Sequence, residues 1–172
     1  NAEHIKAARP EALAEHLKPH LARLGVADPP ADLLAGAIET LQARSKTLVE
    51  MAEGALFYFA PEVDYDPEAA RKFLTPSVKA PLERLRAEVA ALERLEESAV
   101  EEAFGRIMEA TGLKLGKIAQ PVRVALTGKT VSPGIFEIIR VLGRERTLAR
   151  LDRALMRLAA PPSASAPAEK SP

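Results

Sequence analysis

Apolar residues recur every three or four positions along most of the chain, which is the spacing of one buried face on an α-helix. Leu13, Leu17 and Leu21 form the first such stripe, in a helix that begins at Pro10 and ends at Gly25. No stretch alternates apolar and polar residues for long, so the pattern does not favour strands. The sequence therefore predicts an all-α protein of about eight helices.

Capping residues and breaks set the expected helix boundaries. Asp66, Ser98 and Ser132 are expected as N-cap residues, since their side chains can accept from free N–H groups of the first turn. The helices expected after the first are 31–44 with a continuation or restart over 48–56, 67–74, 78–95, 98–112, 117–126, 133–142 and 144–158.

Charge divides the chain near Gly112. Residues 1–112 carry 13 Lys and Arg against 20 Asp and Glu, whereas residues 113–158 carry 10 against 3. We therefore expect two packed helical subdomains over these ranges, followed by a disordered tail rich in proline and serine over 159–172. The basic excess either favours a polyanionic partner or reflects clustering on a solvated face.

Composition narrows the class of protein further. Apolar residues make up 47%, and there is no cysteine, which excludes disulfides and thiolate metal sites and fits a reducing, cytoplasmic compartment. No apolar run approaches the roughly 20 residues of a membrane span, so no membrane partner is expected. The first residues show neither a signal peptide pattern nor a starting methionine, so we expect a fragment of a longer protein.

Gly128-Lys129-Thr130 matches the end of a phosphate-binding loop, but the rest of that motif is missing. A P-loop needs a second glycine five residues before the first of these three, and Arg123 stands there. The loop should also follow a strand, whereas this one follows a helical segment. We expect a glycine-terminated helix and a turn instead of an ATP or GTP site.

Other catalytic and metal chemistry finds little support in the sequence. His16 and His20 are one helical turn apart, but no third ligand accompanies them, so two surface histidines are the better interpretation. Paired carboxylates such as Glu96 and Glu97 are typical of helix starts, where the helix dipole favours them. We therefore expect no catalytic residue and no metal ligand.

Arginines give the clearest chemical signal. Arg123 lies within an apolar run, where a planar guanidinium suits a base edge or a phosphate better than bulk solvent, and Arg44 is a similar candidate in the second helix. A stripe opposite the leucines of the last helix is either its solvated face or a set of phosphate contacts, and consists of Arg146, Arg150, Arg153 and Arg157.

The segment LKLGKIAQPVRVALTGKTVSPGIFEIIRVLGRERTLARLDRAL resembles the C-terminal end of bacterial glutamyl-tRNA synthetases. The matching positions are Gly116-Lys117, Gln120-Pro121, Arg123, Ala125, Thr127-Gly128, Ser132-Pro133 and Leu142-Gly143. Further forward, LQARSKTLVEMAEGALFYF resembles the family's Arg-x-x-Thr-Leu helix and the aromatic pair after it. The resemblance covers about residues 1–158.

The resemblance implies an anticodon-binding region of the α-helix cage type. Arg44 matches the family arginine that discriminates the last anticodon base, and Arg123 matches one that contacts the anticodon. The turn that packs against anticodon bases matches Ser132, Pro133 and Ile135, with Ser and Ile in place of the common Thr and Leu. Surrounding cations would attract phosphates regardless of sequence, and the candidates are Lys117, Lys129, Arg146, Arg150 and Arg153.

The implied partners are the anticodon loop of tRNA(Glu) and the enzyme's own catalytic domain. We expect a monomer that is inactive alone, with ATP and Mg²⁺ used only by the full-length enzyme. Two alternatives stay open: a helical protein-interaction domain without an RNA role, and a nucleotide-binding enzyme built on Gly128-Lys129-Thr130. Arg44 favours an enzyme specific for the glutamate tRNA over one that also charges the glutamine tRNA.

Overall fold

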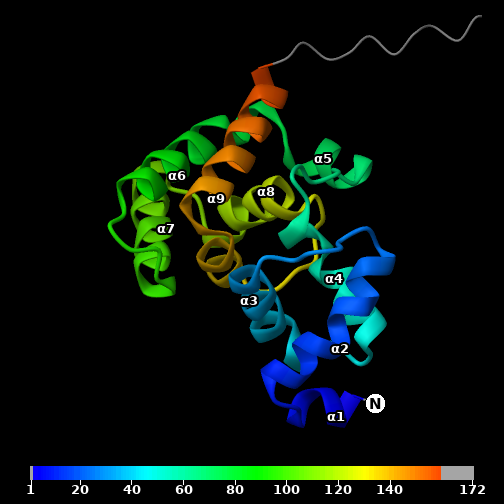
Figure 1. The fold of residues 1–172 in the computed structure, drawn as a ribbon. Coiled ribbons are helices and arrows are strands. Elements are labelled where there is room, and N and C mark those ends of the chain that lie inside the picture. Colours follow the sequence, from blue (N-terminus) through cyan, green and yellow to red (C-terminus); the bar gives the residue numbers. More distant parts are fainter. Residues whose placement is uncertain (1, 160–172) are drawn as a thin grey trace, which may run out of the picture.

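The computed structural model describes residues 2–159, which contain nine α-helices, two short 3-10 helices and no strand (Figure 1). The predicted all-α class is confirmed. The predicted tail lies outside the described residues from position 160 onward. In chain order the elements are α1 (Ala2–Ala7), α2 (Pro10–Arg23), α3 (Ala31–Leu41), η1 (Gln42–Arg44), α4 (Leu48–Phe59), α5 (Pro67–Phe73), η2 (Pro76–Val78), α6 (Lys79–Ala91), α7 (Glu97–Thr111), α8 (Leu115–Thr127) and α9 (Ile135–Ala159).

The first helix, α1, was not predicted. Its only buried residue is Ile5, so the segment has no repeating apolar pattern. The side-chain N–H of Gln42 donates to the carbonyls of Ile5 and Ala8, at 2.8 and 2.9 Å. This distant side chain fixes the end of α1, and a six-residue pattern carries no sign of such a contact.

Local capping was predicted correctly at one of three positions. Asp66 caps α5, where its Oδ2 accepts from the N–H of Ala69 at 2.9 Å. The prediction for Ser98 is wrong, because α7 already begins at Glu97 and no side chain caps it. The prediction for Ser132 is also wrong, since α9 begins only at Ile135 and the Ser132 hydroxyl donates to the carbonyl of Pro133.

Two helical boundaries differ from the predicted ones in ways that matter for the site, and a third agrees. The helix expected to run past Arg44 ends at Leu41, and Arg44 lies in the 3-10 turn η1. The helix expected over 117–126 begins earlier, at Leu115, so Pro121 lies further inside it. The predicted break between the last two helices is found at Gly143, whose φ of 79° and ψ of 173° interrupt α9.

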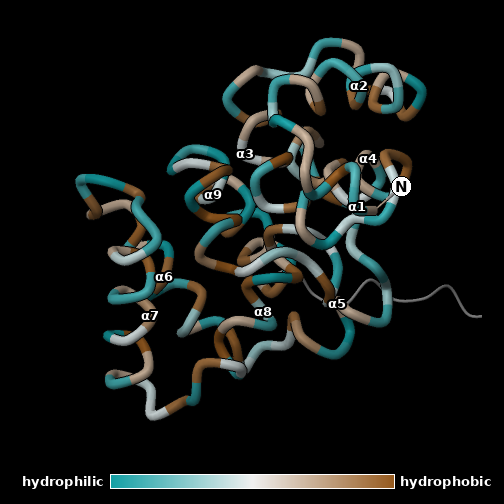
Figure 2. The backbone as a smooth tube through the Cα atoms, turned by 90° about the horizontal axis from the view of Figure 1, so that it is seen from below, coloured by the Kyte–Doolittle hydropathy of each residue, from teal (hydrophilic) through white to brown (hydrophobic). Residues whose placement is uncertain are grey.

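The helices pack into two groups that share one continuous core. The first group is α2, α3 and α4, and the second is α6, α7, α8 and α9. α8 lies near the middle of the molecule, in contact with α4, α5, α6, α7 and α9 (Figures 1 and 2). The predicted boundary at Gly112 stays a prediction, although α6 and α7, which precede it, pack against α8 and α9.

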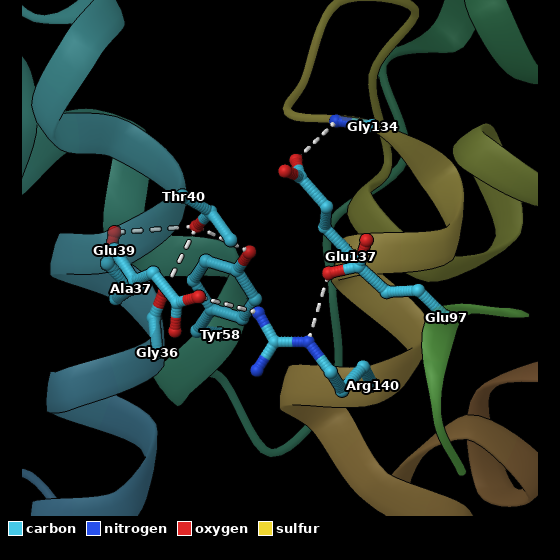
Figure 3. A network of polar contacts seen from close by, with 9 residues as sticks. All are labelled: Gly36, Ala37, Glu39, Thr40, Tyr58, Glu97, Gly134, Glu137 and Arg140. Carbon is cyan, nitrogen blue, oxygen red and sulfur yellow. Dashed lines mark hydrogen bonds and ion pairs between the residues drawn. The ribbon is translucent and has the colours of Figure 1, made fainter.

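α3 and α9 meet directly and join the two groups. A Cβ on Gly36 would overlap the side chain of Val141, so the helices approach closely at this glycine. Beside it, Arg140 of α9 bonds to Glu39 of α3 at 3.2 Å and to Glu97 of α7 at 3.0 Å (Figure 3). This seam fixes α3, and therefore the η1 turn after it, relative to the start of α9.

Candidate nucleic-acid interface

The turn between α8 and α9, residues 128–134, is anchored to the connector 60–66 that follows α4. Gly128 ends α8 in the left-handed region at φ 80°, and its carbonyl accepts from the N–H of Asp66 at 2.8 Å. A Cβ on Gly128 would overlap the carbonyl of Asp64. Glycine is required here both by the backbone angle and by the approach of the connector.

This geometry differs from a phosphate-binding loop. Lys129 and Thr130 follow the end of a helix, whereas a P-loop lysine opens one. The hydroxyl of Thr127 accepts from the N–H of Lys129 at 3.1 Å and lies 2.8 Å from the carbonyl of Arg123, to which it donates. The predicted glycine-terminated helix followed by a turn is therefore confirmed.

The start of α9 explains why Ser132 does not cap it. Gly134 occupies the position before the first helical residue, and its N–H donates to the carboxylate of Glu137 at 3.1 Å (Figure 3). Ser132 stands two residues too early to reach the free N–H groups of the first turn. Pro133 and Ile135 are buried, so they shape the turn from beneath.

Arg44 reaches this turn from the other half of the chain. Its Nη1 donates to the carbonyl of Ser132 at 2.7 Å, while the side chain stays exposed. Two residues predicted separately, 88 positions apart, are thus in contact. The hydrogen bond orients the guanidinium along the rim of the turn.

Arg123 is half-buried on α8, and its Nε is a buried donor without a hydrogen-bond partner among the described residues. Burial lowers the pKa of this guanidinium, and the neighbouring charge of Arg44 lowers it further. The buried Oε1 of Gln120, one helical turn earlier, also lacks a partner. Such groups cost about 1–3 kcal/mol each unless something bonds to them, and no described residue does so for either atom.

A pocket of about 510 Å³ opens beside the turn. Arg44, Lys129, Ser132 and Pro133 line it, whereas Lys117, Arg123 and Ile135 do not. Its apolar lining comes mainly from Leu41, Leu56, Phe57, Val63 and Val131, and its carboxylates are Glu50, Glu53, Glu62 and Asp64. Neither Gln120, beyond its place in the motif, nor the acidic lining was predicted from the sequence.

The predicted phosphate contacts fall into two places. Lys117 and Lys129 are exposed on α8 and on the turn. The three arginines of α9, Arg146, Arg150 and Arg153, line a second pocket of about 390 Å³ instead. Of these cations, only Lys129 lines the first pocket.

Of the two interpretations of the arginine stripe on the last helix, the solvated face is wrong for Arg150. Only 5% of it is exposed, and its guanidinium donates to the carbonyls of Leu126 and Ala60, at 2.7 and 3.0 Å. The connector 60–66 covers this face of α9, and the arginine is held by one carbonyl of the connector and one of α8. Arg146 remains exposed, and Arg153 is half-buried with its guanidinium 4.7 Å from the ring centre of Tyr65.

Within residues 2–159, no group of three histidine or acidic side chains could hold a metal ion. The two histidines of α2 differ in exposure, His16 being exposed and His20 half-buried. Membrane spans were sought in the same part of the chain, and none of its helices combines the length and apolar character to be one.

Comparison with known proteins identifies the family. A sequence model of the family described as "Anticodon binding domain" matches residues 12–155. The glutamate–tRNA ligases of Syntrophobacter fumaroxidans and Desulfosudis oleivorans are 53% and 56% identical over 90% and 88% of this chain. The chain spans about a third of their length, 33% and 32%.

A solved structure supports the same fold. The crystal structure of a glutamate tRNA ligase from Elizabethkingia meningosepticum in complex with its amino acid matches 92% of this chain with a TM-score of 0.81, at 22% identity and over 31% of that protein. At this identity the likeness concerns the fold alone. Because the family model matches residues 12–155, which is most of the sequence, the chain belongs to the anticodon binding domain family.

Proposed function

We propose that this chain reads the anticodon loop of tRNA(Glu) as part of a glutamate–tRNA ligase. The observation that carries the proposal is the juxtaposition of Arg44 and Arg123, two guanidinium groups beside one turn, of which Arg123 has a buried Nε without a partner. Membership of the anticodon binding domain family and the names of the relatives support it.

The chemistry of an unpaired base fits this arrangement. Loop bases are recognised when they are splayed out, packed on side chains and hydrogen-bonded along their edges. The apolar lining of the first pocket offers the packing surface, with Pro133 beneath the turn and Ile135 buried behind it. Arg44 and Arg123 supply donors to base acceptors, and Gln120 supplies an acceptor to base amino groups.

The sequence-independent part of binding would come from exposed cations. Lys129 borders the pocket and Lys117 lies on the first turn of α8. Each phosphate that they neutralise releases counterions, so affinity would fall as salt rises. In this proposal the lysines hold the loop and the arginines select its bases.

The remaining functional properties belong to the whole protein. Its reaction would be the attachment of glutamate to tRNA(Glu) with ATP and Mg²⁺, carried out by a catalytic domain that would be this chain's intramolecular partner. We propose that the enzyme works in the cytoplasm as a monomer, without a membrane partner. No residue of this chain is proposed as catalytic.

Binding of an anticodon stem–loop RNA tests the assignment. Arg44→Gln is expected to lower discrimination between the glutamate anticodon and one changed at its last base by about 1–3 kcal/mol. Arg123→Ala is expected to weaken binding by a similar amount. The matched control is Arg84→Gln, since Arg84 is an exposed arginine on α6 that lines neither pocket. This variant should lower RNA affinity only slightly, and equally for both anticodon sequences.

Two outcomes would contradict the proposal. If Arg44→Gln and Arg123→Ala bind like Arg84→Gln, these arginines are not the reading site. If the chain does not bind RNA, or binds it independently of sequence even at low salt, a protein-interaction domain explains the fold better. Charging of the glutamate and glutamine tRNAs by the full-length enzyme then tests whether Arg44 enforces specificity for the glutamate tRNA.

A further inference from the structure

The second pocket is lined by a set of arginines that the proposed anticodon site does not use. It has a volume of about 390 Å³ and lies between the start of α3, the end of α4 and the second half of α9. Ala60 and Glu62 line both pockets, so the two sites lie on either side of the connector 60–66. Its size falls in the range of about 300–1,000 Å³ that is typical of small-ligand sites.

Three guanidinium groups line this pocket. Arg150 is buried and held by two carbonyls, and burial together with the charge of Arg146 lowers its pKa to about 10. Arg153 donates to the carbonyl of Val63 and stacks on Tyr65. Arg146 is exposed and has only a 3.3 Å bond to the carbonyl of Leu142 in its own helix. Buried positive charge without a close carboxylate favours an anionic ligand.

The acidic side chains nearby offset only part of this charge. Glu145 lines the pocket from α9, and Glu62 lies 3.7 Å from Arg153, with its side chain 75% exposed. An ion pair at this distance and exposure contributes little. In addition, α3 begins at the pocket without a side-chain cap on its first N–H groups, and the positive end of the helix dipole adds to the arginines.

The other walls are apolar. Leu33, Phe59 and Pro61 face the same space as the arginines. A ligand that fits both parts carries a charged group and a ring or other apolar portion, which is the make-up of a nucleotide. Arginine forks also match the geometry of phosphate oxygens.

We propose that this second pocket, lined by Arg146, Arg150 and Arg153, binds a phosphate group. The phosphate comes either from a free nucleotide or from the backbone of the RNA bound at the neighbouring site, and the chemistry of recognition is the same for both. The proposal does not require that Arg44 and Arg123 read an anticodon.

The test follows the amide signals of Leu33 and Phe59 by NMR while the chain is titrated with inorganic phosphate, with AMP and with the anticodon stem–loop. We expect saturable shifts with AMP or with the stem–loop. Arg146→Gln, which removes an exposed side chain with no tertiary hydrogen bond among the described residues, should weaken this binding about tenfold or more. Arg84→Gln is the matched control and should leave it unchanged.

A second variant predicts the opposite sign. Glu62→Gln removes a competing carboxylate and should tighten AMP or phosphate binding a few-fold, which a general loss of structure would not do. Arg44→Gln should leave AMP binding unchanged, so failure of the anticodon proposal is distinguishable from failure of this one.

Two outcomes decide between the sources, and two others overturn the proposal. Arg146-dependent binding of AMP identifies a free nucleotide as a ligand, and Arg146-dependent binding of the stem–loop alone identifies the RNA backbone. If no probe shifts Leu33 and Phe59 in a saturable way, or if Arg146→Gln binds as tightly as the parent chain, the proposal is overturned.

Discussion

Two polar clusters lie close to the junction of the helix groups, and they are built in opposite ways. In the first, the hydroxyl oxygens of Thr40 and Tyr58 are 2.8 Å apart, and the Thr40 hydroxyl also donates to the carbonyl of Gly36 at 3.0 Å (Figure 3). In the second, on α8, the Nε of Arg123 and the Oε1 of Gln120 are buried without partners.

The two clusters differ in whether their buried polar groups are hydrogen-bonded within the fold. Buried polar groups are bonded in the great majority of cases, so the first cluster is what a stable core requires. Four buried side-chain atoms in the described part of the chain lack a partner, and two of them lie one turn apart on α8. The first cluster therefore stabilises the fold, whereas the hydrogen-bonding capacity of the second is not used by the described residues, in keeping with the proposed role of Arg123.

The largest effect is expected from breaking the anchor of the turn beside the second cluster. Gly128→Ala should lower the free energy of unfolding by about 3 kcal/mol or more, since a left-handed backbone and an overlap with the Asp64 carbonyl combine. Gly112→Ala is a matched control with a similar φ of 71° and open space around it, and should cost about 1 kcal/mol. Equal losses in urea denaturation would mean that the connector does not press on Gly128.

The first cluster should respond to alkaline pH. Burial raises the pKa of Tyr58 to about 12, against an ordinary value of 10.0. The folded state therefore keeps this proton longer than the unfolded chain, and its stabilising effect is complete below pH 10 and lost as pH rises towards 12. The loss amounts to about 2–3 kcal/mol. It is measured as the difference in unfolding free energy between the parent chain and Tyr58→Phe across this window.

Tyr65 provides the control for that experiment, because it is the second of only two tyrosines. Tyr65→Phe leaves Tyr58 alone to titrate, and the absorbance of tyrosinate then reports its pKa directly. A pKa near the ordinary value in this variant would contradict the expected burial of the Tyr58 hydroxyl.

A smaller effect is expected from Thr40→Val, which keeps the shape of the side chain and removes its hydroxyl. The buried Tyr58 hydroxyl then loses its partner, and the free energy of unfolding should fall by about 1–2 kcal/mol. Combining it with Tyr58→Phe should recover part of the loss, because the unpaired group is removed too. If the double variant is no better than the sum of the single ones, the two hydroxyls are not coupled.

The smallest effect on stability, and the one that sharpens the comparison most, is expected at Arg123. Arg123→Gln should lower the free energy of unfolding by no more than about 0.5 kcal/mol, since its Nε makes no bond that the variant could lose, and removing the unpaired donor acts in the opposite direction. The same variant should weaken RNA binding as strongly as predicted for Arg123→Ala. A loss of stability comparable to that of Thr40→Val would mean that Arg123 supports the fold.

The sequence predicted those features that depend on near neighbours in the chain. Asp66 caps its helix because the side chain and the N–H that it accepts from are three residues apart. Gly128 was expected to end a helix for the same reason, and Arg123 was singled out by the apolar run around it. Each of these inferences needs only a few adjacent residues.

Features that depend on distant contacts were missed. Counting positions along the helix placed Arg150 on a stripe that was either solvated or in contact with phosphates, but the connector 60–66 covers it. Ser132 was expected as a cap, yet its carbonyl bonds to Arg44 and its hydroxyl to Pro133. The motif around Gln120 could be recognised, but not that its oxygen would be left without a donor, because that depends on what the rest of the fold brings near it.

The position of α9 in the fold has a consequence for how the protein is made. α3, α6, α7 and α8 all pack against α9, which begins only at Ile135. During translation α3 emerges from the ribosome before α9 has been synthesised. The apolar face of α3 that α9 covers in the folded protein is therefore exposed until then. The first group of helices can associate during translation, whereas the core as a whole closes only after α9 has emerged. A nascent chain stalled before Ile135 should therefore be the form most dependent on chaperones.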